Sequence, residues 1–229
     1  MTKYTTLLLA ATLVACSTKT SQGTDTTAAH PPADPDVAAQ GSGIPAGFTA
    51  VTDDTTAQIT NARYVTKAGN WEVTTGPAHI IFAPKDTASG TYTVTASFAQ
   101  LEAPRHPEGY GLFIGGRDLA SPNRVYTYFL VRGNGQFLVK SRAGAKTSDV
   151  IAWRADPAVE KADTAGRASN RMSIRVTADS VRFMLNDKQV AAVKAGTIAT
   201  DGVAGLRINH NLHVTTAPVA IARQAATGR

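Results

Sequence analysis

The residues best suited to chemistry gather in one short stretch, HPEGYGLFIGGRDL, which runs from His106 to Leu119. His106 and Glu108 could exchange protons with a substrate, provided that they lie within hydrogen-bonding range of it. His210, far along the chain, is a third residue of this kind. We therefore treat Glu108, His106 and His210 as candidate catalytic residues and their role as a hypothesis.

The chain contains none of the better-defined catalytic motifs. A glycosidase needs two carboxyl groups at a defined separation, and the sequence has no Glu-x-Asp-x-x-Glu strand of the laminarinase type. It also lacks a Gly-x-Ser-x-Gly nucleophile elbow and a His-Glu-x-x-His zinc helix. A divalent cation such as calcium would need carboxylate and carbonyl ligands, and no such set can be assigned. The sequence favours a binding protein over an enzyme and leaves any cofactor unknown.

Aromatic, cationic and amide side chains alternate along the middle and C-terminal parts of the chain. Proteins bind sugars in concave sites, with aromatic rings against the C–H faces and a few polar groups that hydrogen-bond the hydroxyls. In VYTYFLVR the two tyrosines share the face opposite the plain apolar one. We predict a carbohydrate site with these ligand-binding residues: Tyr126, Tyr128, Arg132, Arg117, Trp153, Asn209 and Asn211.

The stretch GLFIGGR is expected to be one strand that supports this site. Strict alternation places Phe113, Gly115 and Arg117 on the same face. Glycines inside a strand often mark the close approach of a ligand or of another backbone. Both interpretations of these glycines are open.

Side chains of alternating character recur in short segments between residues 48 and 229. TYTVTASF and RMSIRVT each place apolar residues on one face and polar residues on the other. Asn186-Asp187 and Gly133-Asn134-Gly135 are turn sequences that would join neighbouring strands. LRINHNLHV, residues 206–214, is expected to form one long final strand. Repeated short strands without a sustained helical period predict an all-β fold, an antiparallel β-sandwich.

The C-terminal strands carry a resemblance to a known fold. NRMSIRVTADSVRFMLNDKQVAAV, followed by DGVAGLRINHNLHVTTAPVAI, resembles the last strands of concanavalin A-like, laminin-G-like jelly rolls. The chain is especially similar to the bacterial 3-keto-disaccharide hydrolase domain family. The resemblance implies a concanavalin A-like jelly roll. It also implies an enzymatic alternative, the cleavage of an oxidised glycan with Glu108 or a histidine as base, with or without a metal ion.

The N-terminal stretch MTKYTTLLLAATLVACS resembles the signal peptide of a bacterial lipoprotein. It has a positive residue near its start, a short apolar segment and a lipobox that ends at Cys16. The resemblance implies that residues 1–15 are removed and that Cys16 is lipidated. Residues 16–47 are poor in apolar residues and are predicted to form a disordered linker. The sandwich is assigned to residues 48–229.

The lipid on Cys16 would be the membrane anchor. No other stretch is long and apolar enough to span a bilayer, and attachment by several acyl chains is stable. Ser17, in place of the aspartate that marks retention in the inner membrane, favours the outer membrane. Cys16 is also the only cysteine, so the mature chain has no thiol left for a disulfide. The predicted location is the bacterial cell envelope.

The chain has a net charge of +6 and an isoelectric point near 9.6, and its basic residues are dispersed. Dispersed positive charge attracts anionic polymers and lipid headgroups in a general way. Without a recognition helix or a stacking platform, nucleic acid is not an expected partner. The expected partner is carbohydrate or another envelope polymer. A structural or protein-interaction module is the third interpretation, beside the binding protein and the enzyme.

Overall fold

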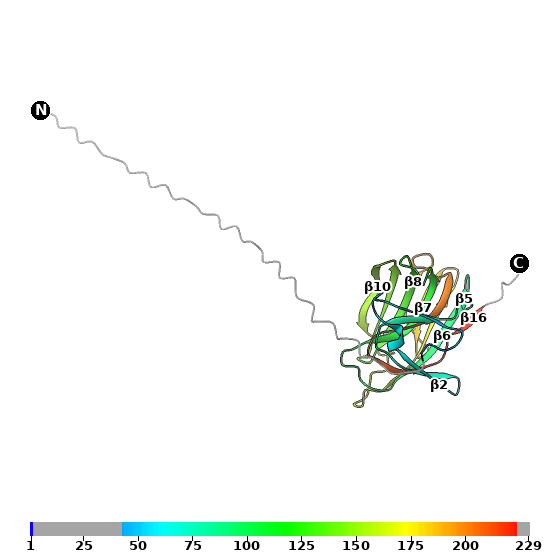
Figure 1. The fold of residues 1–229 in the computed structure, drawn as a ribbon. Helices are drawn as coiled ribbons and strands as arrows, with labels where there is room; N and C mark the ends of the chain where they lie inside the picture. The colour runs from blue at the N-terminus through cyan, green and yellow to red at the C-terminus, as the bar shows by residue number, and fades with distance from the viewer. Residues whose placement is uncertain (2–42, 224–229) are drawn as a thin grey trace, which may run out of the picture. The chain divides into compact units, whose positions relative to one another are not determined.

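The structure is a computed structural model that describes Met1 and residues 43–223 (Figure 1). Cys16, the predicted signal peptide after Met1 and most of the predicted linker lie outside the described residues. Within the described residues, no helix has the length and apolar character needed to cross a membrane.

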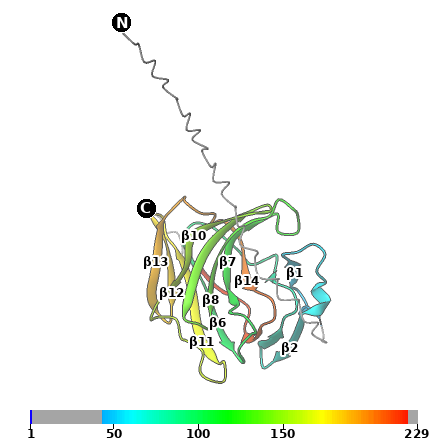
Figure 2. The same cartoon turned by 90° about the vertical axis from the view of Figure 1, so that its left-hand side faces the viewer.

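Residues 49–223 form two antiparallel sheets packed face to face (Figures 1 and 2). Sheet A has the strand order β1-β4-β14-β7-β8-β9-β10, with β5 paired to β14. Its strands are β1 (Thr49–Thr52), β4 (His79–Phe82), β5 (Thr87–Ala88), β7 (Gly109–Arg117), β8 (Val125–Arg132), β9 (Gln136–Ala143), β10 (Lys146–Ala155) and β14 (Gly202–Ile208).

Sheet B has the strand order β13-β12-β11-β6-β15-β3-β2, with β16 paired to β6. Its strands are β2 (Arg63–Lys67), β3 (Asn70–Thr74), β6 (Tyr92–Gln100), β11 (Ala168–Val176), β12 (Ser180–Leu185), β13 (Lys188–Lys194), β15 (His213–Thr216) and β16 (Ala220–Arg223). A short 3-10 helix, η1 (Ile59–Asn61), is the one helical element of the described residues. The predicted all-β antiparallel sandwich is confirmed.

The core between the sheets follows from the alternation of apolar residues. Along β6, the side chains of Tyr92, Val94, Ala96 and Phe98 are all buried, whereas their neighbours face away from the core. Rings from the two sheets meet in the middle, where Phe129 of β8 lies 5.2 Å from Phe183 of β12, centroid to centroid. Burying each such ring stabilises the fold by about 1.5–3 kcal/mol.

The predicted single strand over residues 206–214 is wrong. β14 ends at Ile208 in sheet A, and β15 begins at His213 in sheet B. Asn211, with a φ of 53°, adopts the left-handed conformation that asparagine tolerates better than most residues. The residues between the two strands therefore form a turn that crosses from one sheet to the other. This crossing places Asn209 and His210 at one end of sheet A.

A bulge in β7 changes the expected position of Arg117. Gly115 has a φ of 67°, and a Cβ there would lie 2.4 Å from the carbonyl oxygen of Ala199. The register shifts between Ile114 and Arg117, so that Arg117 pairs with Val125. Arg117 is consequently exposed at the end of the strand and does not share the face of Phe113. Strict alternation failed here because a bulge adds a residue to one strand.

Candidate functional site

The face of sheet A that points away from the core, called here the outer face of sheet A, carries a second apolar cluster. Cross-strand pairs such as Phe113 with Tyr128 build it from neighbouring strands. It is separate from the main core and has Trp153 packed at its margin. Its buried members are Ile80, Phe82, Phe113, Leu119, Tyr126, Tyr128, Leu130 and Leu138.

The two tyrosines of the predicted sugar site lie on this face, but their rings are covered. Tyr126 is 0% exposed and Tyr128 is 5% exposed. Phe113 packs against Tyr126, and the guanidinium of Arg207 lies 4.7 Å from the centroid of the Tyr128 ring. Neither ring presents a free face to a ligand. The prediction that Tyr126 and Tyr128 offer stacking surfaces is corrected on this ground.

A carboxylate from the loop after β1 closes the middle of the same face. Asp53 accepts hydrogen bonds from Nη1 of Arg207 at 2.8 Å and from Nη1 of Arg142 at 3.1 Å. Arg124 holds the same loop by donating to the carbonyl oxygen of Thr52 at 2.9 Å. Burial raises the pKa of Asp53, but the hydrogen bond and charge of Arg207, with the charges of the other two arginines, hold the pKa below its ordinary value. We infer that this network is a structural clamp.

An accessible part of the outer face lies around Trp153, a half-buried residue of β10. The guanidinium of Arg132 lies 4.2 Å from the centroid of the Trp153 ring. The ring also passes close to Gly109, where a Cβ would lie 3.1 Å from Cη2 of Trp153. Gly109 pairs with Arg132 in the register of β7 and β8, so the backbone brings these groups together. Because Gly109 has no side chain, the Trp153 ring can approach the backbone of β7 closely. The space beside this glycine is therefore filled by Trp153.

A carboxylate, an imidazole and an amide meet beside this ring. Oε1 of Glu108 lies 2.8 Å from Nε2 of His210, and Oε2 of Glu108 accepts a hydrogen bond from Nδ2 of Asn209 at 3.0 Å. The backbone N–H of Asn209 donates to the carbonyl oxygen of Gly109 at 3.0 Å, which ties the crossing turn to β7. We call the following set the Trp153 cluster: Glu108, Arg132, Trp153, Asn209 and His210.

The cluster combines solvent access with constrained polar groups. The side chains of Glu108 and His210 are 18% and 23% exposed, so a ligand can reach them. Burial lowers the pKa of Arg132, although the nearby Glu108 carboxylate opposes that effect. Nε of Arg132 donates to Oε1 of Gln136 at 2.9 Å, which fixes the guanidinium beside the ring. Oδ1 of Asn209 is buried and accepts no hydrogen bond from the described residues. Unsatisfied buried acceptors are uncommon in folded proteins.

The remaining predicted residues lie outside this arrangement. His106 is exposed, and no hydrogen bond or ion pair joins it to Glu108 or His210 in the described structure. Asn211 forms the crossing turn next to the cluster, and Arg117 lies beyond the bulge. The described residues contain no group of three or more His, Cys, Asp or Glu side chains placed to hold a metal ion.

Sequence reasoning missed Asp53, Arg207 and Gln136 as parts of this face. Asp53 and Arg207 are 154 positions apart, and the loop that carries Asp53 has no motif that points to an arginine partner. Gln136 directly follows the predicted turn Gly133-Asn134-Gly135, and hairpin pairing places it opposite Arg132. The register of the predicted hairpin could therefore have placed Gln136 next to Arg132. The sequence holds no comparable indication that Asp53 contacts Arg207.

Comparison with known proteins finds relatives only at the level of fold. No protein-family model matches the chain, and no curated protein matches it. Among solved structures, the carbohydrate-binding module CBM66 from Bacillus subtilis is similar with a TM-score of 0.53 and 14% identity, over 77% of this chain and 95% of that one. A Bacillus subtilis protein of unknown function with a galectin-like fold gives a TM-score of 0.57 and 15% identity, over 77% and 89%.

The exoplasmic/lumenal domain of VIP36, solved in a Ca²⁺/Man-bound form, is also similar. Its TM-score is 0.55 at 7% identity, over 80% of this chain and 85% of that one. Likeness at such low identity shows a shared architecture. The chain has the two-sheet jelly-roll fold shared by galectin-like and concanavalin A-like lectin domains.

Proposed function

We propose that this chain is a lipid-anchored protein of the bacterial cell envelope whose sandwich binds carbohydrate at the Trp153 cluster. The observation that carries the proposal is the half-buried Trp153 ring, held by Arg132, beside the hydrogen-bonded Glu108, Asn209 and His210. An aromatic ring beside a few converging polar groups is the composition of a sugar site.

The roles of the residues follow from their chemistry. Arg132 lies over one face of the Trp153 ring, and the exposed remainder of this half-buried ring offers an apolar surface to the C–H groups of a sugar. The Glu108 carboxylate can accept hydrogen bonds from sugar hydroxyls, because a carboxylate has more acceptor sites than its two present partners use. Arg132 has donors beyond those that reach Gln136. The cluster can therefore contact both the apolar C–H groups and the polar hydroxyl groups of a sugar.

The similar structures support the proposal without deciding it. CBM66 is described as a carbohydrate-binding module, and the VIP36 domain was solved in a Ca²⁺/Man-bound form. A jelly roll supplies a broad sheet face on which such sites can be built. For this chain, the site is argued from the side chains of the Trp153 cluster.

A glycan array probed with the purified sandwich domain tests binding. We expect a positive signal that Trp153→Ala and Arg132→Gln abolish. Arg117→Gln serves as the matched control, because it removes an exposed arginine of the same sheet outside the cluster. Silence of the wild-type protein across neutral and charged glycans would contradict the proposal, as would equal loss in the control.

The lipid anchor is tested separately on the full-length chain. We expect Cys16 to carry the lipid, so that the mature protein partitions into detergent and its mass includes acyl chains. Cys16→Ser should release the protein into the soluble fraction. An unmodified N-terminal region in the mature protein would contradict the anchor and would leave carbohydrate binding untouched.

The enzymatic alternative, a glycan-cleaving activity like that of 3-keto-disaccharide hydrolases, is favoured by one contact. The Glu108–His210 hydrogen bond resembles the way in which a carboxylate orients an imidazole that acts as a general base. In this alternative, His210 takes a proton from the substrate while Glu108 orients its ring. Turnover of a 3-keto glycoside, with and without added divalent cation, tests it. Loss of turnover in Glu108→Gln and His210→Gln would support it, and no turnover under either condition would exclude this substrate class.

A further inference from the structure

Two arginines face each other across the outer face of sheet B, the face that points away from the core. Arg175 of β11 pairs directly with Arg182 of β12 in the strand register. Both side chains are exposed, and neither forms a hydrogen bond or an ion pair with the described residues. Like charges directly opposite each other destabilise a sheet. An anion bound between them would remove this repulsion.

Further positive charge lies along the same face. Lys194 pairs with Ser180, which places it on the same side as Arg182. Arg171 precedes Arg175 by four positions, about 13 Å along the strand at ~3.3 Å per residue. Two acids lie close to this charge: Asp187 forms an ion pair with Arg171, and Asp179, which bonds its own turn, interacts electrostatically with Arg182. We call the following set the basic row: Arg171, Arg175, Arg182 and Lys194.

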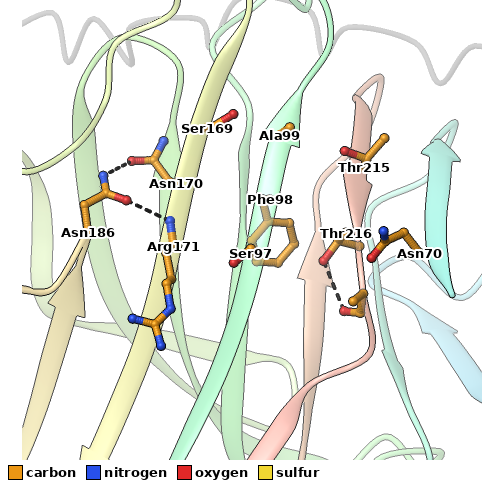
Figure 3. A pocket seen from close by; sticks show the side chains of 11 residues that line it. Asn70, Ser97, Phe98, Ala99, Ser169, Asn170, Arg171, Asn186, Thr215 and Thr216 are labelled. Carbon is orange, nitrogen blue, oxygen red and sulfur yellow. Dashed lines mark hydrogen bonds between the residues drawn. The ribbon is translucent and has the colours of Figure 1, made fainter. Parts of the chain in front are cut away.

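A hollow of about 420 Å³ adjoins the basic row (Figure 3). It lies on the outer face, because Phe98 of β6 packs into the core and its neighbours Ser97 and Ala99 point the other way. In Figure 3 its floor is formed by small side chains of β6 and β11, with Arg171 and Asn186 on one side and Thr215 and Asn70 on the other. The residues with hydroxyl groups that line it are Ser97, Ser169, Thr215 and Thr216.

One wall of the hollow is held rigidly. Nδ2 of Asn186 donates to the carbonyl oxygen of Ala158 at 2.9 Å and to Oδ1 of Asn170 at 3.1 Å. Its Oδ1 accepts from the backbone N–H of Arg171 at 2.8 Å (Figure 3). By contrast, the hydroxyl groups of Ser97 and Ser169 donate to no acceptor among the described residues. A preformed hollow with free hydroxyls can hydrogen-bond a ligand at little ordering cost.

We propose that the basic row and the hollow form a second binding surface, which takes an acidic polysaccharide chain. Carboxylate or sulfate groups of the polymer pair with the arginines of the basic row, and sugar hydroxyls enter the hydroxyl-lined hollow. Charge complementarity selects the polymer's anionic groups. The spacing of Arg171 and Arg175 matches an extended ligand better than a single small anion.

A polymer fits this surface better than a lipid membrane does. Apart from Met1, the described residues expose no large hydrophobic side chain that could insert into a bilayer. A planar layer of headgroups would also leave the hollow unfilled. The Trp153 cluster lies on the outer face of sheet A, so the two surfaces face away from each other. One molecule can therefore contact two glycan chains at once.

The test compares binding of the full chain, kept in detergent, to immobilised alginate, a polyuronate, and to neutral dextran. We expect binding to alginate that weakens as salt is added. In Arg175→Gln/Arg182→Gln the affinity should fall about tenfold, because two exposed ion pairs are lost. The matched control Arg117→Gln/Lys146→Gln removes two exposed positive charges from strands of sheet A and should stay within about twofold of wild type.

The outcomes separate this proposal from the proposed function. Trp153→Ala should leave alginate affinity unchanged, and Arg175→Gln/Arg182→Gln should leave binding of glycan-array ligands unchanged. Thermal unfolding should show that the arginine variant is at least as stable as wild type, since a repulsion is removed. Equal weakening in the control variant, or no alginate binding at low salt, would overturn the proposal. Binding to phosphatidylglycerol vesicles that depends on Arg175 and Arg182, without alginate binding, would overturn it in favour of membrane docking.

Discussion

Glu108 and His210 lie 2.8 Å apart, from Oε1 to Nε2, although 102 positions separate them in the chain. Glu108 immediately precedes β7, and His210 lies in the turn by which the chain leaves β14 for the other sheet. Because β7 and β14 are antiparallel neighbours, the start of one strand meets the end of the other. The carboxylate–imidazole pair is therefore a product of sheet topology.

Replacing Glu108 with glutamine should weaken sugar binding more than it weakens folding. Glutamine keeps the shape but loses the charge that strengthens hydrogen bonds, so we expect about a tenfold loss of affinity for the ligand that the array identifies. The unfolding free energy should fall by no more than about 1 kcal/mol, because the pair is partly exposed. Calorimetric titration and urea unfolding measure the two quantities. Glu102→Gln, at the exposed carboxylate next to His213, is the control and should leave affinity intact.

Replacing Asp53 with asparagine should destabilise the sandwich. The change removes the charge that compensates Arg207, a buried guanidinium only 6% exposed. A buried charge left without its partner costs about 3–5 kcal/mol, and residual hydrogen bonding by asparagine should bring the loss to about 2–4 kcal/mol. Urea unfolding at neutral pH measures it. Asp187→Asn, which breaks an exposed pair with Arg171, should change little, and a similar loss in both variants would contradict the clamp.

The stability of the sandwich should fall in mildly acidic solution because of His79. Burial lowers the pKa of this fully enclosed imidazole to about 4, from an ordinary value of 6.5. Between these values the unfolded chain binds a proton that the folded chain does not, so stability decreases as the pH falls from about 6.5 to about 4. The loss should reach about 3 kcal/mol and then level off.

Unfolding of His79→Gln across this range checks the assignment. The variant should lose part of the pH dependence, whereas His106→Gln, at an exposed histidine, should retain the wild-type profile. An unchanged profile in His79→Gln would show that another group titrates.

Gly115 should resist substitution more strongly than Gly196, a glycine that also has a positive φ but lies in open space. In Gly115→Ala the new Cβ would meet the carbonyl oxygen of Ala199 at 2.4 Å, in addition to the strain of a φ of 67°. Gly196→Ala carries a similar strain at a φ of 82°, but it opens onto free space. We expect a loss of about 1 kcal/mol for Gly196→Ala and of 3 kcal/mol or more for Gly115→Ala. Thermal unfolding of both variants tests whether the bulge requires glycine.

Local patterns in the sequence determined the architecture. The alternation in TYTVTASF and RMSIRVT became the inward faces of β6 and β11. The turn Asn186-Asp187 has φ values of 49° and 66°, as its composition predicted. These features depend on neighbouring residues, and such short-range preferences can be read from a linear pattern. The lipobox at Cys16 is equally local, and it stays a prediction.

The tertiary structure alone decided which of the patterned residues are accessible. A period of two assigned Tyr126 and Tyr128 to the non-core face, but a loop carrying Asp53 and the guanidinium of Arg207 cover that part of the face. The period of two also could not predict the contact between Glu108 and His210, because that contact depends on the order of the strands in the sheet. Alternation specifies the side to which a residue points, whereas coverage and convergence arise from segments far apart in the chain.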